Sequence, residues 1–214
     1  MRVNAEAPVA RLLLAHGAGA PMDSDFMNAL AEALAAKGVS TLRFEFPYMA
    51  TRRQTGAKRP PDREPRLLDC WREWVRAVDR SEESLPLLIG GKSMGGRMTS
   101  IAAAEGLLPD VRGLVFFGFP LHPAGKASTD RADHLAAVTV PMLFLQGTRD
   151  RLADPGLIEA VCADLGALAT LRKFVGADHS FAYLKSAGRP DAAVDAEIAA
   201  AVRTFVTAVG ATTA

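Results

Sequence analysis

The sequence predicts an α/β fold in which a mostly parallel sheet of about six strands carries helices on both faces. Short apolar segments alternate with longer amphipathic ones along most of the 214 residues, which is the pattern of a parallel sheet covered by helices. Hydrophobic residues make up 49% of the chain and charged residues 23%, which is an ordinary globular composition. The length suits one domain with a substantial core. We therefore expect a single domain that spans residues 1–214.

The predicted strands are short and apolar, as buried parallel strands are. Each helix pattern is longer and has an apolar face. Asp154 is a typical helix cap, and Pro155 suits the first turn that follows it. The expected strands are residues 10–15, 39–44, 85–90, 113–118, 142–146 and 169–174, and the expected helices are 25–36, 65–80, 94–105, 155–165 and 192–209.

Two segments interrupt this alternation, residues 46–65 and 119–134. The first is rich in arginine, lysine and proline and has no periodicity, so we expect a long surface loop. Both follow predicted strands, at the side where ligands bind in open α/β sheets. Each is therefore either a wall of a binding site or a solvated connection. The basic residues of the first loop either attract an anionic partner or are simply solvated; they include Arg52, Arg53, Lys58 and Arg59.

Charge and cysteine content argue against several classes of protein. Lys and Arg total 25 against 24 for Asp and Glu, so the chain lacks the general basic field that nucleic-acid binding usually requires. Cys70 and Cys162 lie far apart in helix-like segments, so we expect reduced core thiols rather than a disulfide or a metal site. No segment is typical of a signal peptide or long enough to cross a bilayer. We expect a cytoplasmic protein with no membrane partner.

The strongest functional signal is the segment LLIGGKSMGG at residues 87–96. An apolar strand pattern runs into Gly-x-Ser-x-Gly and then into a helix, which is the pattern of a nucleophile elbow. In such a turn the serine, here Ser93, has a strained backbone, and Gly91 and Gly95 let strand and helix cross closely. The competing interpretation is a tightly packed turn with no chemistry, since fold alone does not imply function.

A serine hydroxyl becomes a nucleophile when a base removes its proton, and a third group best orients that base. Asp150 follows the fifth predicted strand and His179 follows the sixth, so both are expected at the sheet edge that carries Ser93. We predict that Ser93 attacks, that His179 is base and then acid, and that Asp150 orients His179. Asp154 competes for the role of the acid, whereas Asp178 suits a turn acceptor.

The oxyanion that forms on attack needs donors, usually backbone amides. One candidate is the amide of Met94, at the start of a helix whose dipole favours negative charge. The other lies in the loop HGAGA at residues 16–20, which resembles the His-Gly oxyanion loop of esterases and lipases. That resemblance implies the amide of Ala18, with Gly17 as the alternative. We expect His16 to brace the loop rather than to ionise in catalysis.

From the loop at His16 to the turn at His179, the chain resembles the α/β-hydrolase superfamily. The segments LLAHGAG at 13–19, GGKSMGGR at 90–97 and FPLHP at 119–123 look like a small bacterial branch without a cap domain. That branch is similar to the hydrolase-like region of a eukaryotic histone-acetyltransferase complex subunit and to a testis-expressed relative. The resemblance implies an α/β-hydrolase fold. Compared with larger family members, we expect the chain to lack the first one or two antiparallel strands, since its first clear predicted strand already begins at residue 10. Dienelactone hydrolases are similar in size but carry cysteine at the position of Ser93.

We therefore predict a serine hydrolase that cleaves a small-molecule carboxylic ester or thioester through an acyl-enzyme, with no metal and no organic cofactor. In the second loop, Phe119 and His122 are candidates for substrate binding, although His122 is as well suited to a proline-bounded turn. Trp71 and Trp74 are three residues apart on a predicted helix, which favours packing. The alternative function is a non-catalytic hydrolase-fold module that binds a partner protein.

Overall fold

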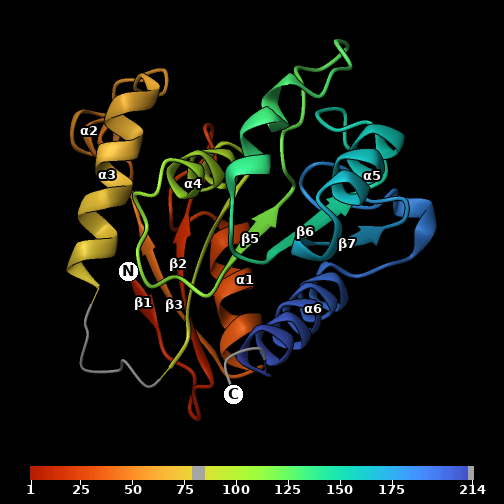
Figure 1. Ribbon diagram of the computed structural model, residues 1–214, viewed down its shortest axis with the longest axis horizontal. Coiled ribbons are helices and arrows are strands. Elements are labelled where there is room, and N and C mark those ends of the chain that lie inside the picture. The colour runs from red at the N-terminus through yellow and green to blue at the C-terminus, as the bar shows by residue number, and fades with distance from the viewer. Residues whose placement is uncertain (79–84, 212–214) are drawn as a thin grey trace.

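The structure, a computed structural model, describes residues 1–78 and 85–211. Its centre is a seven-stranded sheet with the order β1-β3-β2-β4-β5-β6-β7, shown in Figure 1. Six strands run parallel, whereas the first pairs antiparallel with β3. The strands are β1 (Arg2–Val3), β2 (Ala10–Ala15), β3 (Val39–Phe44), β4 (Leu87–Lys92), β5 (Gly113–Phe117), β6 (Met142–Gly147) and β7 (Ala169–Phe174).

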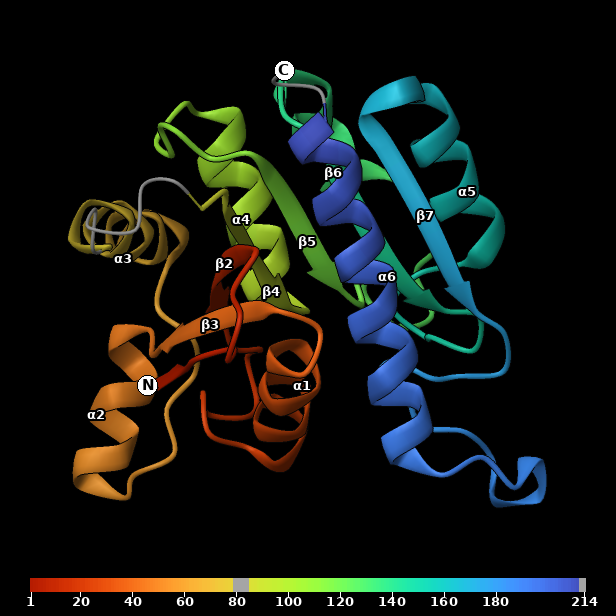
Figure 2. The same ribbon diagram turned by 90° about the horizontal axis from the view of Figure 1, so that it is seen from below.

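Helices cover both faces of the sheet, and each face of the sheet has its own apolar core beneath the helices (Figures 1 and 2). On one face, α1 (Asp25–Ala35) and α6 (Asp191–Ala211) pack on alternate side chains of the strands. The other face is covered mainly by α3 (Glu64–Ala77), α4 (Met94–Ala104) and α5 (Pro155–Asp164). This core contains Trp71, which is fully buried, and Trp74 packs against it beside Phe44. The expected packing role of both tryptophans is confirmed.

The main error of the sequence prediction lies in residues 46–65, which are not a continuous loop. Pro47–Thr55 form helix α2, which starts with a proline in its first turn and ends at Gly56 in the left-handed conformation. Both are ordinary helix boundary signals. Tyr48 and Met49 are buried, so the helix is anchored by two inward side chains in a segment whose other residues are mostly polar.

Smaller differences concern strand and helix ends. Of the one or two antiparallel strands expected to be missing, one short strand is present, because Arg2 and Val3 pair antiparallel with β3. Strand β4 starts two residues later than expected, since Pro86 has no N–H for the ladder, and it runs on to Lys92. Helix α3 ends at Ala77, and the last two residues of its expected range, 79–80, lie outside the described part of the chain.

The connections between the described elements hold three 3-10 helices. Residues 118–141 join β5 to β6 and hold the 3-10 helix η2 (Asp130–Ala137), so no lid is inserted there, as predicted. Two further 3-10 turns are η3 (Gly166–Leu168) and η4 (Lys185–Ala187). Cys70 and Cys162 are free and buried, as expected. In the described residues, none of the helices is apolar over a length that could span a membrane.

Candidate active site

Ser93 occupies the turn between β4 and α4, in a backbone conformation of φ 52° and ψ −118°. Positive φ is unfavourable for a residue with a side chain, so this turn must be held by its surroundings. The glycines on either side explain how. A Cβ on Gly91 would lie 2.4 Å from the carbonyl carbon of Gly95, and one on Gly95 would lie 2.5 Å from the oxygen of His16. The strand, the helix and the first loop therefore approach more closely than any larger residue allows.

The imidazole of His179 is bound to Asp150, with 2.6 Å between Nδ1 and Oδ2. Asp150 is buried, and two further donors hold its carboxylate, Nε2 of Gln146 at 2.6 Å and the amide of Leu152 at 2.8 Å. Because Nδ1 faces this carboxylate, Nε2 is the ring nitrogen left to accept a proton. Gln146 also accepts a hydrogen bond from the amide of Phe119, which fixes its amide orientation. Sequence reasoning did not single out Gln146.

Ser93 and His179 line the same cavity, which has a volume of about 400 Å³. Among the described residues, Ser93 Oγ makes no hydrogen bond to His179. Catalytic hydrogen bonds are often longer without substrate, and here the two side chains share one cavity without being hydrogen-bonded. Other lining residues are Gly17, Ala18, Gly19, Ala20, Ser24, Phe26, Met27, Lys92, Leu152 and Ser180.

The loop after β2 forms one wall of this cavity. The ring of His16 is buried, donates from Nδ1 to the oxygen of Gly17 and accepts at Nε2 from the amide of Phe46. Burial lowers the pKa of His16, which fits a neutral imidazole that braces the loop, as expected. Ala18 lies in this wall, and Met94, the other predicted amide donor, is the first residue of α4. First-turn amides have no partner within their own helix.

Tyr48 supports the same loop from α2, a role that the sequence prediction missed. Its hydroxyl lies 3.0 Å from the oxygen of Ala18 and 3.3 Å from that of Gly17. Its ring packs edge-on against His16. Burial raises the pKa of Tyr48, so the hydroxyl keeps its proton and remains a donor. The signal available in the sequence was Pro47, since proline is favoured at the first position of a helix.

The competing acids have other roles. Asp154 caps α5 by accepting from the amides of Gly156 and Leu157. Asp178 accepts from the amides of Ser180 and Ala182, the turn role predicted for it.

The two candidates for substrate binding are placed elsewhere. Phe119 has no exposed surface and packs on Phe116 and Phe144, so its expected contact with substrate is wrong. His122 is buried, with Nδ1 against the oxygen of Pro123 and Nε2 accepting from the amide of Asp154. Both ring nitrogens are therefore engaged with the main chain, which agrees with the turn role left open for His122. An apolar strand end explains the error at Phe119, because the chain enters the core after β5 before it reaches the surface.

The described residues hold no group of three or more His, Cys, Asp or Glu arranged to bind a metal ion. The cavity lining instead carries the hydroxyls of three serines (Ser24, Ser93 and Ser180), the imidazole of His179 and the amine of Lys92, beside a small-residue loop and the start of α4. These groups can perform nucleophilic acyl chemistry.

A family model described as an alpha/beta hydrolase domain matches residues 8–207. The chain belongs to the alpha/beta hydrolase family. Solved alpha/beta hydrolases share the fold at low identity. A serine hydrolase homologue from Coxiella burnetii is 17% identical with a TM-score of 0.68, covering 96% of this chain and 88% of that one. A serine hydrolase without lid from Xanthomonas campestris is 23% identical with a TM-score of 0.66, covering 94% and 84%. A dienelactone hydrolase from Anabaena variabilis is 21% identical with a TM-score of 0.67, covering 96% and 89%.

Proposed function

We propose that this alpha/beta hydrolase is a serine hydrolase that cleaves a carboxylic ester or thioester through an acyl-enzyme. The observation that carries the proposal is the strained Ser93 on the wall of a cavity that it shares with His179, whose Nδ1 is bound to a buried carboxylate. A nucleophile, a base and an orienting group in this relation are the components of acyl transfer.

In the proposed reaction, His179 Nε2 takes the proton of Ser93 as Oγ attacks the substrate carbonyl carbon. The amides of Met94 and Ala18 donate to the resulting oxyanion, while Asp150 stabilises the imidazolium. Collapse of the tetrahedral intermediate breaks the bond to the leaving group, which departs as an alcohol or thiol with the proton from His179. Water then attacks the acyl-serine with His179 again as base, and this releases the carboxylic acid and free Ser93.

The cavity suits a small apolar acyl group. Its volume of about 400 Å³ lies in the range of small-molecule sites, about 300–1,000 Å³. Phe26, Met27 and Leu152 supply apolar side chains to its lining, and no carboxylate is among the lining residues. We therefore expect short, uncharged acyl esters or thioesters to be better substrates than acyl groups that carry a positive charge.

The test is labelling of Ser93 by a fluorophosphonate probe together with turnover of short-chain aryl esters. Ser93→Ala should abolish labelling and reduce turnover to the uncatalysed rate. Ser180→Ala is a matched control, because this serine lines the same cavity and has no proposed role in the chemistry. Equal turnover by wild type and Ser93→Ala would contradict the assignment.

The second candidate is a non-catalytic module that binds a partner protein, as the resemblance to the eukaryotic complex subunit implies. The observation in its favour is that Ser93 and His179 are not hydrogen-bonded in the described structure. The basic segment after β3 would then be its contact surface, although Arg53 is already paired with Asp23 and Glu45. A protein that neither reacts with the probe nor hydrolyses any acyl ester or thioester would favour this candidate.

A further inference from the structure

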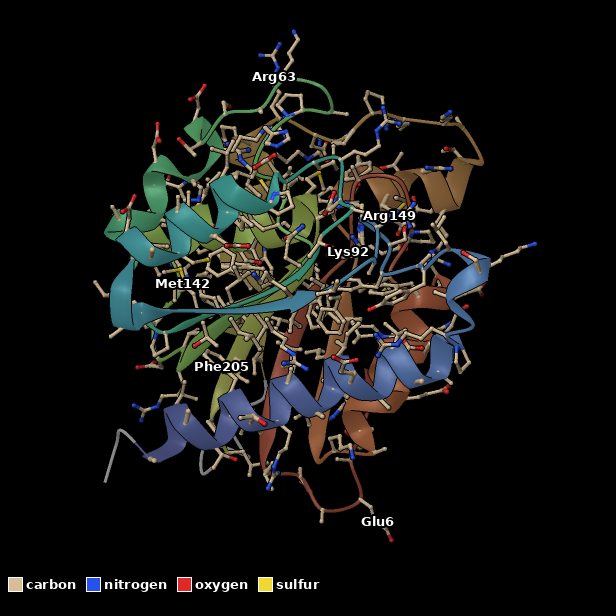
Figure 3. The ribbon with its side chains drawn as sticks, turned by 90° about the vertical axis from the view of Figure 1, so that its right-hand side faces the viewer. Glu6, Arg63, Lys92, Met142, Arg149 and Phe205 are labelled. Atoms are coloured by element: carbon tan, nitrogen blue, oxygen red, sulfur yellow. The ribbon has the colours of Figure 1, made fainter. Side chains whose placement is uncertain are left out.

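Lys92, the residue before the nucleophile, reaches from the end of β4 to the loop that carries the base. Its Nζ donates to the main-chain oxygen of His179 over 2.7 Å. The ammonium also lies 5.9 Å from the centroids of the Phe26 and Phe181 rings, whose planes are parallel. Lys92 is half-buried and is labelled near the middle of the view in Figure 3. The mechanism above leaves this side chain without a role.

The loop that carries His179, residues 175–184, is here called the histidine loop. Other hydrogen bonds of this loop join it to the segment after β6 that carries Asp150. The amide of Arg149 donates to the oxygen of Ala177 over 2.8 Å. The amide of Gly176 donates to the hydroxyl of Thr148 over 2.9 Å. Of the hydrogen bonds recorded between described residues, that of Lys92 is the one that joins this loop to the nucleophile strand. It therefore spans the two halves of the site.

Gly118, directly after β5, leaves room for this bond. It has a φ of +70°, and a Cβ there would lie 3.1 Å from Lys92 Nζ and 3.3 Å from the oxygen of His179. Both contacts are tighter than most Cβ atoms make. A side chain at residue 118 would therefore press on both the donor and the acceptor.

We propose that Lys92 is a positioning residue, which sets the separation between Ser93 and the imidazole of His179 by holding the main chain of the base. This inference rests on the proposed function. Asp150 fixes the ring of His179 relative to β6 and Lys92 fixes its main chain relative to β4, so both restraints act on the distance from Nε2 to Ser93. Acyl transfer is sensitive to such placement, since about 1 Å of misplacement can cost about 10²-fold in rate.

The charge of Lys92 affects the strength of this hold. Burial lowers the pKa of Lys92 to about 8, against the opposing influence of the carboxylates of Asp150 and Asp178. His179 faces it from the same loop as Asp178, and α1 contributes the ring of Phe26. A charged donor makes a hydrogen bond about twice as strong as a neutral one, so the hold on His179 weakens as the ammonium loses its proton.

The test compares Lys92→Met, which removes the donor from a chain of similar length, with Lys92→Arg, which keeps a cationic donor. With an aryl ester, we expect Lys92→Met to lower kcat about 10- to 100-fold with KM within about twofold, because the amine is already bound to the main-chain oxygen of His179. Lys92→Arg should recover part of the loss. Wild-type kcat should fall above about pH 8, and Lys92→Met should lack this fall. Lys173→Met, which removes a surface ion pair with Glu159, is the matched control.

A second measurement does not depend on turnover. The ring nitrogens of His179 can be followed by ¹⁵N nuclear magnetic resonance, since the chain has only 4 histidines. Lys92→Met should shift the His179 signals while the melting temperature stays within a few degrees of wild type. Unchanged kcat, or His179 signals identical to those of wild type, would overturn the proposal. An inactive wild type would refute the proposed function, and the His179 signals would still decide whether Lys92 positions the loop.

Discussion

Gly147→Ala should separate the two loops that carry Asp150 and His179. Gly147 is the last residue of β6, and a Cβ there would lie 2.5 Å from the main-chain oxygens of both Ala177 and Asp178. Both oxygens belong to the loop that leads into His179. The backbone of Gly147 is not in the left-handed region, so the effect of the substitution is one of space alone.

The size of the effect follows from these distances. Ordinary contact begins near 3.4 Å, so the histidine loop must recede by about 0.9 Å. That movement takes the bond between His179 and Asp150 from 2.6 Å towards about 3.5 Å, the limit of a useful hydrogen bond. We expect kcat/KM to fall about 10²-fold. Overpacking of this kind destabilises by about 1–3 kcal/mol, or roughly 2–12 °C in melting temperature at this chain length.

The assay is aryl ester turnover combined with thermal unfolding by circular dichroism. Gly210→Ala is the control, because a Cβ there meets nothing within 4 Å and the residue lies in helix α6. That change should leave kcat unaltered and be neutral or slightly stabilising, since alanine is the better helix former. The reasoning is refuted if Gly147→Ala matches Gly210→Ala in both kcat/KM and melting temperature.

Three other substitutions test further parts of the structure. Tyr48→Phe removes the hydroxyl that holds the carbonyls of residues 17–18. In steady-state kinetics it should lower kcat about fivefold, which corresponds to the loss of one net hydrogen bond. The control Tyr183→Phe, which removes an exposed hydroxyl, should leave kcat unchanged. Gln146→Leu leaves the buried amide of Phe119 without its acceptor and should destabilise by about 1–3 kcal/mol, measured by urea unfolding. Burial lowers the pKa of His134 to about 4 from 6.5, with Arg97 adding to the shift. Because protons then bind the unfolded chain more readily, stability should fall as pH drops from about 6.5 towards about 4, and melting curves of His134→Gln should show a smaller decline.

Most strand positions could be predicted because buried parallel strands leave a simple record in the sequence. Residues 10–15 and 39–44 are strands as predicted, since each is a short buried segment bounded by turn or loop signals. The sequence prediction failed where a few inward residues decide the structure of a polar segment. In α2, only Tyr48 and Met49 of nine residues are buried, so no averaged pattern shows that the helix is anchored.

The site was predictable to the extent that parallel topology places strand ends together. Asp150 and His179 each follow a strand that ends at the same edge as β4, and the structure shows them in contact. The residues that hold them could not be deduced in this way. Gln146 and Lys92 look like ordinary strand residues, and their roles depend on where the side chains of neighbouring loops arrive. Phe119 was misplaced for the converse reason, since its position after a strand gave no sign that the chain turns inward.

The structural cost of the site bears on the choice between enzyme and binding module. A residue held at positive φ, such as Ser93, costs about 1–3 kcal/mol, and Asp150 is buried with donors from three separate residues. A surface that only binds a partner gains nothing from either feature, because neither a strained serine backbone nor a buried carboxylate adds contact area. Acyl transfer requires an exposed nucleophile and a carboxylate shielded from water. These two features therefore favour catalysis, and labelling of Ser93 in wild type but not after Ser93→Ala is the result that this argument requires.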